Sequence, residues 1–82
     1  MTSLDIIKHK IQRIYKTNPN IHINIALTNP KVNLNGEPAV IKGVYSHIFQ
    51  IEEYSTGSLK RHTLQYTDVL SHHIEIAELG EI

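Results

Sequence analysis

The chain has 82 residues, of which 40% are hydrophobic and 20% are charged, and its formal net charge at pH 7 is zero. Such a chain is too apolar to be disordered and too short for more than one core, which leaves little room for an enclosed substrate cleft. It contains no cysteine, which excludes disulfides and thiolate zinc sites. We therefore expect one unprocessed domain over residues 1–82 in a cytoplasmic setting.

The zero net charge hides an uneven distribution. Residues 1–42 carry six basic and two acidic side chains, a net charge of +4. Residues 43–82 carry two basic and six acidic side chains, a net charge of −4. The simpler interpretation is two ordinary solvated faces. The alternative is a dipolar molecule that associates with itself or with a charged partner.

Residues 3–16 are predicted to form an amphipathic helix. The apolar residues recur at spacings of three and four: Leu4, Ile7, Ile11 and Ile14. Thr2 or Ser3 can accept hydrogen bonds from the first free amides, and Asn18 before Pro19 ends the helix. The N-terminal residues contain no continuous apolar run, so we expect neither a signal peptide nor a membrane span.

The rest of the chain is predicted to form five short strands within residues 21–79. The clearest is 21–27, where isoleucine and leucine alternate with other residues at a period of two. Residues 28–38 contain two prolines, three asparagines and a glycine, which predicts a loop or a long hairpin connection. Asn35 and Gly36 can supply the positive φ of a tight turn.

The remaining pattern predicts strands at 39–46, 47–54, 59–66 and 72–79, a turn at 55–58, and a helical turn at 67–70. Gly43 is expected to mark a bend or bulge, and Thr67 or Asp68 to cap the helical turn. The predicted core includes Ile23, Ile25, Ile48, Val69 and Leu70. The predicted fold class is mainly β with one N-terminal helix (α+β), a small five-stranded antiparallel barrel of SH3-like or Sm-like type.

No pattern indicates catalysis, a cofactor or a metal. The six histidines have no ligand-like spacing, and His72 and His73 should point to opposite faces of a strand. Ser46 beside His47 lacks a glycine elbow, and the four glycines form no phosphate loop. Glu52 and Glu53 should face opposite ways as edge charges. We therefore expect no enzyme activity and no cofactor.

One cluster is a candidate surface for a protein partner or for nucleic acid, if the strands pair as a barrel. Its members are Tyr45, Lys60, Arg61, His62 and Tyr66. Basic groups beside aromatic rings can clamp a phosphate backbone and stack bases. The simpler interpretation is that Phe49 is core, Tyr66 is a half-buried anchor, and the basic residues form an ordinary solvated patch.

Two segments of the chain resemble the Veg family of small Firmicute proteins. "VYSHIF" at 44–49 is similar to the family's "TYPSVF", and "LQYTDVL" at 64–70 is similar to "YSYADVL". The gap between these segments is nearly the same as in the family, and "SLDIIKHKI" at 3–11 resembles the family's "TLSDIKRSL". Where the family has a basic, glycine-rich "KANGGRRKT", this chain has "LTNPKVNLNGEPAV".

The resemblance implies a small β-barrel without enzymatic activity, connected with transcriptional regulation and biofilm formation through protein contacts. The expected partner is a protein such as a transcription regulator, with weak or no nucleic-acid binding and no membrane contact. Self-association through the charge asymmetry or through free sheet edges is a further expectation. The alternative function is an Sm-like protein that binds single-stranded nucleic acid.

Overall fold

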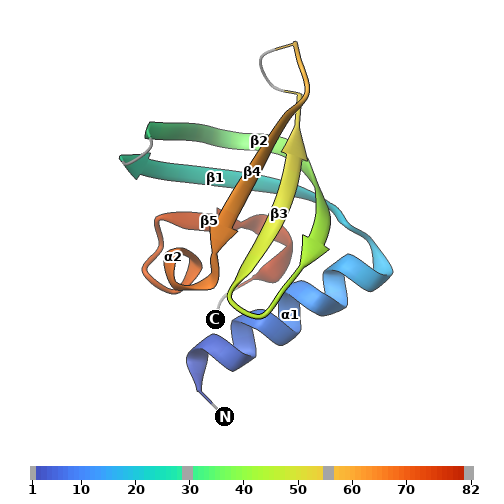
Figure 1. The fold of residues 1–82 in the computed structure, drawn as a ribbon, viewed down its shortest axis with the longest axis vertical. Coiled ribbons are helices and arrows are strands. Elements are labelled where there is room, and N and C mark those ends of the chain that lie inside the picture. The colour runs from blue at the N-terminus through green and yellow to red at the C-terminus, as the bar shows by residue number, and fades with distance from the viewer. Residues whose placement is uncertain (1, 29–30, 55–56, 81–82) are drawn as a thin grey trace.

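A helix, a five-stranded antiparallel sheet and a short helix before the last strand make up the structure (Figure 1). The computed structural model describes residues 2–28, 31–54 and 57–80. The elements in chain order are α1 Ser3–Thr17, β1 Asn20–Thr28, β2 Lys31–Val44, β3 Ile48–Glu53, β4 Lys60–Gln65, α2 Tyr66–Leu70, β5 Ile74–Ile76 and the 3₁₀ helix η1 Ala77–Leu79. The predicted α+β class, with an N-terminal helix and five strands, is confirmed.

The ends of α1 are fixed by side chains that satisfy its free backbone groups. The Thr2 hydroxyl accepts a hydrogen bond from the Asp5 N–H at 3.2 Å, and the Asp5 carboxylate accepts one from the Thr2 N–H at 3.2 Å. The Thr2 hydroxyl also donates to the Asp5 carboxylate at 2.9 Å, and this bond, together with the one from the Thr2 N–H, holds the pKa of Asp5 below its usual value. At the other end the Asn18 N–H bonds to the Ile14 carbonyl at 2.8 Å, and the helix stops before Pro19 as predicted.

The sheet has the strand order β4-β3-β2-β1-β5, and every neighbouring pair is antiparallel. Residues 31–38 belong to β2 and pair with β1, so the prediction of a loop or long connection was wrong for them and for Thr28; residues 29–30 lie outside the described residues. Pairing with β1 overrides the local preference of asparagine and proline. Pro38 is tolerated because it lies where β2 has only one neighbouring strand, since pairing with β3 begins at Ala39.

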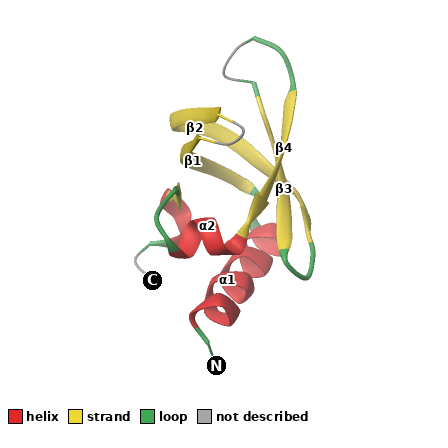
Figure 2. Cartoon of the chain, turned by 60° about the vertical axis from the view of Figure 1, so that its left-hand side comes forward, coloured by secondary structure: helices red, strands yellow, loops and turns green. Residues whose placement is uncertain are grey.

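Two bulges interrupt β2. At the first, Asn35 and Gly36 lie opposite the single residue Asn24, whose side-chain oxygen accepts the Gly36 N–H at 2.6 Å. Gly36 has the expected positive φ of 64°, but in a bulge rather than in a turn. At the second, Lys42 is the extra residue before Gly43, which confirms the predicted bulge. The bulges accompany the bend that turns β3 and β4 away from β1 (Figure 2).

The core lies between the inner face of this bent sheet and the two helices. Its residues, each at most 9% exposed, are Ile7, Ile11, Ile21, Ile23, Ile25, Ala39, Ile41, Phe49, Ile51, Leu64, Tyr66, Val69, Ile74, Ile76 and Leu79. The core prediction was correct for Ile23, Ile25 and Val69. It was wrong for Leu70, which is 42% exposed at the end of α2, and Ile48 is only half-buried because the alternation gives the inner position to Phe49.

The C-terminal part differs from the prediction in its details. α2 is present, but Gln65 occupies its N-cap position and neither Thr67 nor Asp68 caps it. β5 is shorter than predicted, and His72, with a φ of 64°, lies before the strand. Among the described residues β4 and β5 do not pair, so the sheet is open at its two ends. None of the described helices is long and apolar enough to cross a membrane.

Ile25→Ala is expected to lower the free energy of unfolding by about 2–5 kcal/mol, because the side chain is 1% exposed and its removal leaves a cavity. Leu70→Ala is the matched control and should cost on the order of 1 kcal/mol, since that side chain remains partly in water. Urea unfolding of both variants is the measurement. Equal losses would mean that the inner and outer sides have been assigned wrongly.

Candidate binding surface

The five residues of the sequence-predicted surface do not lie together. Lys60 and Arg61 begin β4, whereas Tyr66 follows its end, roughly 17 Å away at about 3.3 Å per strand residue. Tyr45 lies near Tyr66, whose hydroxyl donates to the Tyr45 carbonyl at 2.6 Å. The expectation that the basic residues lie beside both tyrosines is therefore wrong.

Tyr66 is a core residue. It is 4% exposed, and its ring stacks on Phe49 with centroids 5.5 Å apart and an angle of 19° between the planes. Burial raises the pKa of the Tyr66 hydroxyl, although its hydrogen bond to Tyr45 opposes the rise. Phe49 is core as expected, and Tyr66 is more deeply buried than the half-buried anchor that was predicted. Its ring has no free face on which a base could stack.

The three basic residues of β4 alternate between the two faces of the sheet. His62 Nε2 lies 3.2 Å from a carboxylate oxygen of Glu53, which is 1% exposed. Arg61 instead donates from Nε to Glu52 at 3.1 Å, and a second guanidinium nitrogen bonds the same oxygen. Glu52 and Glu53 thus face opposite ways, as predicted, but each is paired across to β4 rather than being a free edge charge.

The face of β2, β3 and β4 that carries Lys42, Gln50, Glu52, Arg61 and Thr63 lies away from the core, and we call it the outer face. Glu52 is central to it, since one carboxylate oxygen bonds Arg61 and the other lies 3.9 Å from Lys42 Nζ. The Glu52 side chain is only 15% exposed, so this carboxylate is largely covered by its neighbours. Two cations share one anion, which leaves the network with a net charge of +1.

Tyr45 lies at the end of the outer face where β3 begins. Its N–H bonds the Ile48 carbonyl at 2.9 Å, and its ring lies against Gly43. A Cβ atom on residue 43 would lie 2.6 Å from the Tyr45 hydroxyl oxygen, so any larger residue there would displace the ring. Tyr45 is nevertheless 51% exposed. Tyr15 of α1 reaches the same bulge and donates to the Lys42 carbonyl at 3.3 Å.

Tyr54 lies at the other end of the outer face, directly after β3. It is 66% exposed, and with Val40 and Glu52 it lines a shallow depression of about 370 Å³. The sequence interpretation missed Tyr54 because it treated the residue only as the end of a strand. The sequence did contain a signal: Tyr54 comes two residues after Glu52, and side chains two residues apart in a strand lie on the same face. The outer face therefore has an exposed tyrosine at each end and a nearly balanced set of charges between them.

Among the described residues, three histidines lie within 4.0 Å of a carboxylate oxygen. The pairs are His22 with Glu78, His62 with Glu53, and His73 with Asp68. Within the described part of the chain, no three histidine, aspartate or glutamate side chains are placed to hold a metal ion.

The His22–Glu78 pair joins β1 to η1. The Glu78 carboxylate accepts the His22 N–H at 2.8 Å, and its other oxygen lies 2.9 Å from His22 Nδ1. Burial alone would raise the pKa of Glu78, but the hydrogen bonds from the His22 ring and backbone outweigh it and hold the pKa below its ordinary value of 4.5. The ionised carboxylate is thus favoured in the folded state.

Comparisons with protein-family models, with curated proteins and with solved structures found no match in any of the three. The resemblance to the Veg family therefore stays a prediction that rests on the segments at 3–11, 44–49 and 64–70.

Glu78→Gln is expected to destabilise the protein at pH 7, and the difference from the parent should shrink in acid. Because the folded-state pKa is lowered, the stabilisation is fully present above pH 4.5 and is lost as the pH falls through the folded-state value. Urea unfolding between pH 7 and pH 3 measures it. Glu75→Gln, at an exposed position on β5, is the control and should change stability by less than about 0.5 kcal/mol. A Glu78→Gln deficit that stays constant with pH would contradict this account.

Proposed function

We propose that the chain is a non-enzymatic, cytoplasmic protein-binding module and that its outer face receives the partner. The observation that carries this proposal is the pair of exposed tyrosines, Tyr45 and Tyr54, at the two ends of a strand-borne surface. Tyrosine and arginine are enriched at protein interfaces and among the residues that contribute most to binding. Because strands carry most of the surface, its backbone is already ordered before a partner arrives, which lowers the entropy cost of binding.

The charges of the outer face favour a protein over nucleic acid. Lys42 and Arg61 are both drawn to Glu52, so a phosphate backbone would have to compete with an existing ion pair. A tight nucleic-acid complex draws on many phosphate contacts, and its affinity falls steeply with salt. A protein partner can use the same network by adding one acidic group, since the network has a net charge of +1.

The resemblance to the Veg family supports a more specific proposal, in which the partner is a regulator of transcription and the process is biofilm formation. The strand order, with a short helix between β4 and β5, supports a second proposal: the fold is an open relative of the SH3-like and Sm-like barrels. In such barrels the same number of strands closes upon itself. Both proposals rest on likeness and on topology rather than on a site.

Replacing both Tyr45 and Tyr54 by alanine is expected to weaken capture of the partner at least about tenfold, because truncating a residue central to binding costs more than about 1 kcal/mol. The measurement is a pull-down from extract of the native host at about 150 mM salt, followed by titration of the protein that is retained. Ile6→Ala, which truncates an exposed apolar residue of α1, is the control and should bind like the parent. Equal retention by all three proteins would refute the outer-face proposal.

A single-stranded nucleic-acid binder is the second candidate, and exposed tyrosines near Arg61 and Lys42 favour it. Fluorescence anisotropy with single-stranded RNA, single-stranded DNA and duplex DNA at about 150 mM salt tests it. We expect dissociation constants weaker than about 1 μM for all three, because few phosphates can be contacted. Tighter binding that is lost when Lys60 and Arg61 are changed to alanine would overturn the protein-binding proposal.

A further inference from the structure

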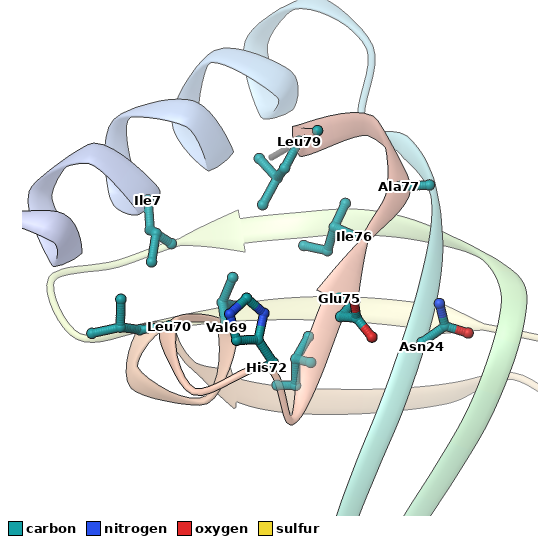
Figure 3. A pocket seen from close by; sticks show the side chains of 11 residues that line it. Ile7, Asn24, Val69, Leu70, His72, Glu75, Ile76, Ala77 and Leu79 are labelled. Atoms are coloured by element: carbon teal, nitrogen blue, oxygen red, sulfur yellow. The ribbon is translucent and has the colours of Figure 1, made fainter. Parts of the chain in front are cut away.

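A pocket of about 570 Å³ lies where α1, α2, β5 and η1 meet, near the end of β4 that leads into α2 (Figure 3). Its apolar wall comes from α1, α2, β5 and η1, and includes Ile7, Val69, Ile76 and Leu79. Leu70 also lines it and is 42% exposed. The volume is within the usual range of about 300–1,000 Å³ for binding pockets, and it has room for a large aliphatic side chain.

The polar side of this pocket contains one carboxylate. Glu75 of β5 lines it, and its carboxylate forms no ion pair with another described residue. The nearby carboxylates of Asp68 and Glu78 are already beside His73 and His22. Of the other polar side chains that line the pocket, Asn24 is occupied by its bond to the Gly36 N–H, and the His72 ring lies between Leu70 and Glu75 (Figure 3). An incoming cation would therefore be received by Glu75, next to an apolar wall that ends at Leu70.

An exposed aliphatic residue followed by a cation lies at the opposite end of β4 from the pocket. Leu59, which is 50% exposed, and the exposed Lys60 lie where the β3–β4 connection enters β4. The pocket lies beyond the other end of β4, because α2 follows that strand directly. Figure 1 shows the start of β4 in the upper part of the molecule and α2 and β5 near the middle, above α1. Leu59 and Lys60 therefore cannot reach the pocket of their own chain.

We infer that the pocket of one copy receives Leu59 and Lys60 of a second copy. Leu59 packs against Leu70 and the apolar wall, and Lys60 pairs with Glu75. The contact joins two unlike surfaces, so it is heterologous. Neither the pocket nor Leu59 belongs to the outer face, so the contact goes beyond the proposed function and leaves that face free for a partner.

Complementary variants test this contact without a change in net charge. Leu59→Ser removes the inserted side chain and Leu70→Ser removes part of the pocket, and both replace partly exposed residues. Sedimentation velocity up to on the order of 1 mM protein, the weak end of measurable affinities, should show assembly of the parent and monomers of each variant. An equimolar mixture of the two variants should form dimers, because it retains one intact pocket and one intact Leu59. Monomeric parent protein, self-assembling single variants or a monomeric mixture would each overturn the proposal.

Variants that change charge test the same contact independently. Lys60→Glu should abolish assembly of the parent, whereas Lys31→Glu, the same charge change at the start of β2, should not. Glu75→Lys tests the pocket side if Leu70→Ser fails to fold, which circular dichroism reports. Equal effects of Lys60→Glu and Lys31→Glu would mean that net charge, and not this contact, controls assembly. No partner protein is present in these measurements, so their failure would leave the outer-face proposal unaffected.

Discussion

The rest of the molecule depends on one constraint, which is that β2 pairs with both β1 and β3. These two neighbours do not lie in one plane. β2 pairs with β1 over residues 31–40 and with β3 over residues 39–44, and each pairing has its own bulge. A bulge adds one residue to a single strand and increases its local bend and twist. The bend turns β3 and β4 across the core so that Phe49 and Leu64 face α1 and α2, while the opposite side of the same strands becomes the outer face.

The same bend decides where the sheet stays open. β4 and β5 are the two ends of the strand order, and α2 and η1 occupy the space between them. Short helices bury apolar residues such as Val69 and Leu79 there, and a pocket remains beside them. Open edges are usually protected against unwanted pairing. Here the charged residues Lys60 and Arg61 at one edge, and the shortness of β5 at the other, have that effect.

The sequence predicted those parts of the fold in which local pattern and tertiary structure agree. The alternation in β1 and the apolar spacing in α1 identify both elements, because each buries one face. It failed for residues 31–38, where polar residues and prolines look like a loop and only pairing with β1 makes a strand. The candidate site was harder still. Tyr45, Tyr54 and Tyr66 are the same residue type, so the sequence does not say which ring is buried. In the structure Tyr66 is the buried ring and stacks on Phe49, whereas Tyr45 lies over Gly43 and stays exposed.

Period-two alternation explains why a run of basic residues did not become a basic surface. In a strand, Arg61 must point away from the side on which Lys60 and His62 lie, so three adjacent cations cannot form one patch. Each face then offers its own acceptor: Glu52 for Arg61 outside, and the buried Glu53 for His62 inside. A buried carboxylate needs such a partner, because an unpaired charge in the core is costly. Cross-strand pairing therefore uses these charges to order the sheet, and the outer face keeps exposed tyrosines at its ends with a nearly balanced set of charges between them.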